Sequence, residues 1–125
     1  MWINVNPNPK RYIVPDCVIR AICFAFNTSW YEVYDDLCAV GRMDCNMPSA
    51  DSVWGHYLHM HGCTPFLLPK SCPKCVTIAE FTKYFPSGTY IIGTGGHAVA
   101  VIDGDYYDSW DSGNEMPSFF WKVPK

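Results

Sequence analysis

The sequence predicts a single α+β domain over residues 1–125, in which N-terminal helices pack on a C-terminal antiparallel sheet. Hydrophobic residues make up 49% of the 125 residues and charged residues 17%, which is typical of one globular core. Apolar residues recur at helical spacing as far as Tyr84, and from Thr89 onward they alternate as in strands. Helices followed by strands are typical of α+β domains rather than of parallel α/β sheets.

The expected helices follow an extended segment, residues 1–15. Prolines at positions 7, 9 and 15 keep this segment extended, because proline lacks the N–H donor that a helix needs. Asp, Ser or Thr precedes each expected helix as its cap, and in two cases Glu follows three residues later, which makes a capping box. The four expected helices run from Asp16 to about Asn27, from Ser29 to Gly41, from Ser49 to Gly62 and from Thr77 to Pro86. Residues 41–48 and 63–76 are expected to be loops.

The expected sheet consists of segments rich in β-branched and aromatic residues. These segments are residues 89–93, 97–102 and 105–110, with residues 119–121 as an edge strand. Asp103 and Gly104 are the preferred pair for a two-residue hairpin turn, and such a turn places Ile102 opposite Asp105.

Charge and apolar patterning exclude several classes of partner. The net charge is −3 and the nine Lys and Arg residues are scattered, so we expect no nucleic-acid partner and no membrane anchor. No apolar run approaches the roughly 20 residues of a membrane helix, and the first ten residues do not resemble a signal peptide. We therefore expect a cytoplasmic protein whose seven cysteines are all reduced.

Cys17 is a candidate nucleophile because of its place in the first turn of the first helix. Backbone N–H groups are unpaired there, and the helix dipole puts partial positive charge at the same end. Both effects stabilise a thiolate, the nucleophilic form of cysteine. Arg20 is expected to pair with Asp16 at the i, i+4 spacing.

His97 is a candidate base because it opens a strand after two glycines. With a two-residue turn at residues 103–104, Val99 faces Asp108, so that His97 and Asp108 are diagonal neighbours on one face of the sheet. A carboxylate at that position can fix the tautomer of the imidazole and stabilise the imidazolium. A three-residue turn would shift the register and bring Asp111 opposite His97 instead.

These residues together resemble the pattern of papain-like cysteine peptidases. In that family the nucleophilic cysteine begins the first long helix, the histidine opens a later strand, and an Asn or Asp followed by Ser-Trp comes from a neighbouring strand. Here the corresponding segments are DC at 16–17, GHAVAVIDG at 96–104 and YDSW at 107–110. The Asp-Cys pair resembles the C39-like branch, and the whole set resembles small bacterial and phage proteins of this type.

The resemblance implies a thiol hydrolase that cleaves an amide bond of a peptide or protein without a cofactor. Its catalytic residues would be Cys17, His97 and Asp108, and Trp110 would shield the histidine from water. The chain departs from the family in three ways, of which one is that the partner of the histidine is Asp rather than Asn. Only 80 residues separate the cysteine from the histidine, against about 130–150 in the papain type, and Arg11 occupies the place of the oxyanion glutamine. Asn8, or Asn6, is then the candidate oxyanion donor.

Other functions remain open at this stage. An amidase or an acyltransferase could use the same three residues, and a non-catalytic binding domain could share the fold. Cys72 and Cys75 form a C-x-x-C that Cys63, His59 and His61 could complete as a zinc site. The irregular spacing, with a proline inside the pair, favours an ordinary reduced loop, and we expect no metal.

Overall fold

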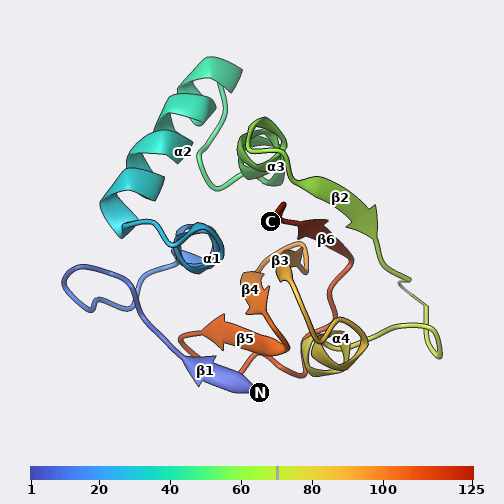
Figure 1. The fold of residues 1–125 in the computed structure, drawn as a ribbon. Coiled ribbons are helices and arrows are strands. Elements are labelled where there is room, and N and C mark those ends of the chain that lie inside the picture. Colours follow the sequence, from blue (N-terminus) through green and yellow to red (C-terminus); the bar gives the residue numbers. More distant parts are fainter. Residues whose placement is uncertain (70) are drawn as a thin grey trace.

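The computed structural model describes residues 1–69 and 71–125, which form four helices and one six-stranded mixed sheet (Figure 1). The helices are α1 (Cys17–Phe26), α2 (Trp30–Asp44), α3 (Asp51–Met60) and α4 (Ile78–Tyr84). The strands are β1 (Trp2–Asn4), β2 (Thr64–Leu67), β3 (Thr89–Gly93), β4 (Ala98–Ile102), β5 (Asp105–Asp108) and β6 (Phe119–Lys122). The expected α+β class is confirmed.

The strand order is β1-β5-β4-β3-β6-β2, and this order corrects three details of the expected sheet. The sheet is mixed rather than antiparallel, because β1 pairs with β5 in parallel. β6 is not an edge strand, because it lies between β3 and β2. β2 falls in the segment expected to be a loop. Its Pro65 argues against a strand in the sequence, but β2 is an edge strand, and an edge strand tolerates proline.

The starts of α2 and α4 are capped as the sequence predicts, whereas the start of α3 and the end of α2 differ. The expectation that Ser49 caps the third helix is wrong, because Ala50 is the N-cap of α3 and makes no side-chain cap hydrogen bond. The Thr77–Glu80 capping box is formed at α4, and Ser29 caps α2 by accepting from the N–H of Glu32. The expectation that Gly41 ends the second helix is wrong, because α2 continues to Asp44. Gly41 serves close packing instead: a Cβ there would lie 2.8 Å from the carbonyl oxygen of Asn46.

Helices cover both faces of the sheet. α1 packs against β3, β4 and β5, with α2 next to α1 and α3 next to α2, and a first hydrophobic core lies between these helices and the sheet (Figure 1). α4 contacts β5, and its Ile78 and Phe81 belong to a second hydrophobic core. Along β4 the side chains alternate between the two cores, with Ala98 and Ala100 toward α1 and Val99 and Val101 toward α4. The two alanines are small, so α1 can lie close to the strand that follows His97.

Replacing Gly93 with Ala tests the contact between β3 and the first residue of β6, Phe119. The added Cβ would lie 2.3 to 2.8 Å from three ring atoms of Phe119, which packs on Trp54. The ring must therefore shift, and we expect the free energy of unfolding to fall by about 1–3 kcal/mol in urea titrations. Gly96→Ala is the matched control, because its Cβ meets nothing within 4 Å. Equal stabilities of the two variants would contradict this packing.

The cysteines differ from the expectation at one pair. Cys72 and Cys75 form a disulfide, so the prediction that all seven cysteines are reduced is wrong for these two. The C-x-x-C spacing brings their Cα atoms to 4.7 Å, a distance that a disulfide spans. The candidate zinc site is not assembled, and no cluster of metal-ligating side chains occurs within residues 1–69 and 71–125.

The helices give no indication of a membrane span. Within the described residues, no helix is both long enough and apolar enough to cross a bilayer.

Candidate active site

Cys17 is the first residue of α1, and the local structure leaves this helix end open to a ligand. The carboxylate of Asp16, the N-cap residue, is engaged by the Nη1 of Arg20 and, at 2.9 Å, by the Nε1 of Trp30. It therefore neutralises Arg20 instead of capping the N–H groups of the first turn. The positive end of the helix dipole then acts on the half-buried Cys17 thiol.

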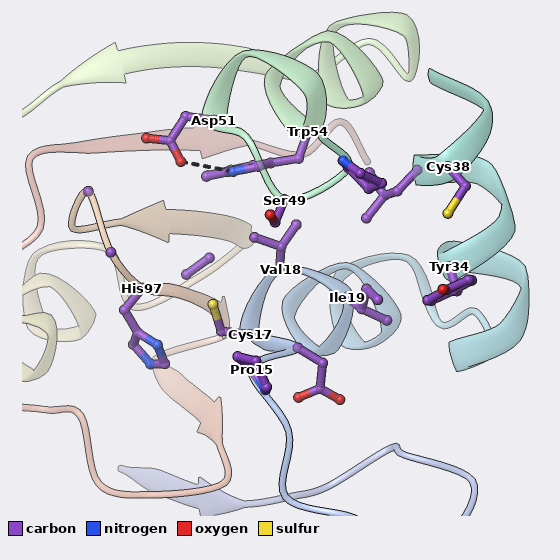
Figure 2. A pocket seen from close by; sticks show the side chains of 16 residues that line it. Pro15, Cys17, Val18, Ile19, Tyr34, Cys38, Ser49, Asp51, Trp54 and His97 are labelled. Carbon is purple, nitrogen blue, oxygen red and sulfur yellow. Dashed lines mark hydrogen bonds between the residues drawn. The ribbon is translucent and has the colours of Figure 1, made fainter. Parts of the chain in front are cut away.

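His97 stands between the Gly95–Gly96 turn and β4 and contacts both other members of the predicted set. Its Nε2 lies 2.6 Å from Oδ2 of Asp108. Nδ1 is then the ring nitrogen that remains for an interaction with Cys17. Figure 2 shows the Cys17 sulfur and the His97 ring next to each other at the cavity.

The hairpin register that brings His97 to Asp108 is the predicted one. Ile102 pairs with Asp105 across a two-residue turn in which Asp103 and Gly104 both have positive φ. Asp111, the alternative partner of the histidine, accepts hydrogen bonds from the Tyr106 hydroxyl and from the N–H of Gly113. The structure therefore brings Asp108, and not Asp111, to the imidazole.

Asp108 is fully buried and accepts hydrogen bonds on both carboxylate oxygens. Oδ1 accepts from Nη2 of Arg20 at 2.9 Å and from the N–H of Ser109 at 2.8 Å. Oδ2 bonds to Nε2 of His97 and accepts from Oγ of Ser112, both at 2.6 Å. Burial acts to raise the pKa of Asp108, but the hydrogen bonds from His97 and Ser112 outweigh it and lower the pKa.

The pKa values of Cys17 and His97 shift in opposite directions. Burial acts to raise the pKa of Cys17, but hydrogen bonds to His97 and the Ala98 N–H, with the charges of His97 and Arg20, lower it below 9.0. Burial acts to lower the pKa of His97, but hydrogen bonds to Asp108 and Cys17 and their charges raise it to about 9. Both shifts favour a thiolate beside an imidazolium.

A cavity of about 490 Å³ opens beside the thiol and the imidazole (Figure 2). Its wall is largely apolar and comes from α1 and the two residues before it, from α2, from α3 and the loop before it, and from residues 95–98. The apolar residues in the wall include Val18, Ile19, Leu37, Pro48 and Trp54. Asp51, whose Oδ1 accepts from the Nε1 of Trp54, adds a carboxylate to the lining.

Trp110 lies where the sequence analysis expects a shielding residue. Its ring centroid is 4.9 Å from that of His97, and the residue is 45% exposed. The indole therefore covers part of the imidazole from the solvent side.

Asn8 and Asn6 do not take the position of an oxyanion donor. Oδ1 of Asn8 accepts from the N–H groups of Lys10 and Tyr12, and the Asn6 side chain bonds to the Tyr12 carbonyl and the Asn8 N–H. Both asparagines organise the loop before α1, and neither is in the cavity lining, which within the described residues begins at Pro15. Arg11, in the place of the family glutamine, donates to the Asn6 carbonyl.

Sequence reasoning missed the contact between Arg20 and Asp108. It predicts the pair with Asp16, which is confirmed, but the second contact joins residues 88 positions apart. The available signal was the place of Arg20 one helical turn after Cys17, on the face that points toward the sheet.

The assembled site contains a thiol whose pKa is lowered, an imidazole next to it whose pKa is raised to about 9, and a buried carboxylate behind the imidazole. Such a set can attack an electrophilic carbon and then deliver a proton to the group that leaves. Comparisons of this chain with models of protein families, with curated proteins and with solved structures found no match.

Proposed function

We propose that this chain is a papain-like cysteine hydrolase that cleaves amide bonds in peptide or protein substrates. Cys17 is the nucleophile, His97 the general acid and base, and Asp108 the residue that orients the imidazole. The observation that carries the proposal is the placement of Cys17 and His97 next to each other at a cavity, with Oδ2 of Asp108 2.6 Å from the His97 Nε2.

The electrostatics of the site support nucleophilic chemistry over a structural role for these residues. A buried cysteine of the ordinary kind has a raised pKa, as Cys23 and Cys63 do at about 11. Cys17 differs from both, because its pKa is lowered in spite of burial. A pKa that is shifted by a specific partner, in a residue next to a cavity, is typical of functional sites.

The proposed reaction has two half-reactions. In the first, the Cys17 thiolate attacks the carbonyl carbon of the amide and the carbonyl oxygen becomes an oxyanion, which the backbone N–H of Cys17 stabilises. The C–N bond then breaks, and the amine leaves with the proton from Nδ1 of His97, so that a thioester remains on the sulfur. In the second, neutral His97 takes a proton from water, hydroxide adds to the thioester carbon, and the C–S bond breaks. This releases the carboxylic acid and restores the thiolate and the imidazolium.

The cavity favours substrates of a certain character. Apolar side chains dominate its wall, and Asp51 adds a carboxylate to the lining. We therefore expect neutral or basic peptide segments with an apolar side chain next to the cleaved bond. Peptidase or isopeptidase action fits best, and an amidase or acyltransferase would pass through the same thioester.

Alkylation by iodoacetamide at pH 7 tests the nucleophile. Cys45 is the most exposed of the free cysteines and Cys17 only half-buried, so exposure alone would make Cys45 react first. The thiolate is the reactive form, and we expect Cys17 to react about tenfold faster than Cys45, measured by mass spectrometry of substoichiometrically labelled protein. Cys23 and Cys63 serve as slow internal references.

Two variants separate the proposal from its alternative. His97→Ala should remove the advantage of Cys17, because the thiol loses the partner that lowers its pKa. Hydrolysis of fluorogenic peptide amides should be present in the wild type and absent in Cys17→Ala. Reaction of Cys45 ahead of Cys17 would end the proposal, and selective alkylation without hydrolysis of any peptide amide would favour the binding domain.

A further inference from the structure

We infer that Arg20 is a positioning residue of the proposed site: its guanidinium holds Asp108 so that Oδ2 faces His97, and it ties the helix of the nucleophile to the strand behind the base. The inference rests on the proposed function and assigns a role to a residue that makes no contact with substrate. Its basis is the geometry of one buried ion-pair network.

The guanidinium bridges two carboxylates inside the protein. Nη1 of Arg20 bonds to Oδ1 of Asp16, and Nη2 bonds to Oδ1 of Asp108 at 2.9 Å. All three side chains are buried, with 7% exposure or less. Burying charges is costly unless they are paired and hydrogen-bonded, so the arrangement is tightly constrained by its surroundings.

The bond from Arg20 decides which oxygen of Asp108 faces the imidazole. The guanidinium and the Ser109 N–H both donate to Oδ1, which leaves Oδ2 for His97 and the Ser112 hydroxyl. Because a carboxylate is planar, fixing Oδ1 also fixes the direction of Oδ2. A carboxylate free to rotate would hold the His97 ring less firmly.

The other end of the network anchors Arg20 itself. Asp16 accepts from the Nε1 of Trp30 at 2.9 Å, which links the network to the first residue of α2. Arg20 lies three residues after Cys17 on α1, whereas Asp108 ends β5. The guanidinium is therefore a bridge between the element that carries the sulfur and the element that orients the imidazole.

The charge of Arg20 acts in the same sense as its geometry. It is among the charges that lower the pKa of Cys17. It also shares the negative charge of Asp108 with His97. Loss of the guanidinium should therefore raise the pKa of Cys17 and leave the His97 ring less firmly oriented.

The test is the pH dependence of Cys17 alkylation by iodoacetamide in wild type, Arg20→Gln and Arg20→Lys. In Arg20→Gln we expect the rate at pH 7 to fall about tenfold, which is the effect of one pKa unit, and the rate profile to move to higher pH. Arg20→Lys restores the charge without the planar fork, and an intermediate rate is expected. The proton NMR signal of the His97 ring N–H that faces Asp108 should shift or broaden in both variants.

Leu58→Ala is the control for a loss of stability alone. Leu58 is fully buried in α3, outside the network, so this variant should unfold more easily in urea while the pH profile of Cys17 stays unchanged. If Arg20→Gln does not fold, Arg20→Lys decides the matter by the same measurements. A folded Arg20 variant with the wild-type profile and the wild-type His97 signal would overturn the inference. Failure of the proposed function is distinguishable, because it would show as an unreactive Cys17 in the wild type.

Discussion

Asp108→Asn is expected to disrupt the site although the two side chains have almost the same shape. The carboxylate accepts from Arg20 and Ser109 on one oxygen and bonds to His97 and Ser112 on the other. An amide has one acceptor and one donor group, so in either orientation its NH₂ would face N–H donors. We expect the free energy of unfolding in urea to fall by about 3–5 kcal/mol, because the buried Arg20 and His97 lose the carboxylate that they share. The selective alkylation of Cys17 should be lost at the same time.

Asp35→Asn is the matched control for this substitution. Asp35 is exposed on α2, so the same change of charge should alter the free energy of unfolding by less than about 0.5 kcal/mol. An Asp108→Asn variant as stable as Asp35→Asn, with Cys17 still selectively alkylated, would show that the carboxylate is not needed for the arrangement.

The protonation of His97 should be visible when an anionic alkylating reagent is compared with a neutral one. Burial opposes protonation, but hydrogen bonds to Asp108 and Cys17 raise the pKa of His97 to about 9. Iodoacetate is attracted by the imidazolium and iodoacetamide is not. The ratio of their rates at Cys17 should be high at neutral pH and should fall as the pH rises through about 9. Amide hydrolysis should decline over the same range, because the proton donor is lost.

The stability of the fold should follow the same titration. The pKa of His97 is raised from 6.5 to about 9, so its contribution to stability is complete below 6.5 and is lost as the pH rises through about 9.

His97→Ala is the control for the comparison of iodoacetate with iodoacetamide. In this variant the ratio of the two alkylation rates at Cys17 should not change between pH 6.5 and about 9. A wild-type ratio that changes near pH 6.5 would show that the imidazole is not held by its two partners.

Features with a local cause could be predicted from the sequence. The capping box of Thr77 and Glu80 and the turn at Asp103 and Gly104 depend on neighbouring residues, and both are formed. The turn also fixes the strand register, which is why the contact between His97 and Asp108 could be worked out in advance.

Features that depend on distant segments could not be predicted. β2 is a strand only because β6 lies beside it, and the sequence around Pro65 does not predict this pairing. Asn8 has the right residue type for an oxyanion donor, but the turn in which its Oδ1 accepts from Lys10 and Tyr12 places it outside the cavity lining. The contact of Arg20 with Asp108 arises only when α1 lies on the sheet.

The pairing of β1 with β5 has a consequence for how this protein can be assayed. Asn4 pairs with Asp108, and the Asp108 carbonyl accepts from the Val5 N–H and from the Trp2 indole. The proposed nucleophile thus depends on a carboxylate whose backbone is held by residues 2–5. If Cys17 reacts as proposed, rapid labelling of that single thiol can serve as a quality check on purified material, since it reports that β1 has docked beside β5.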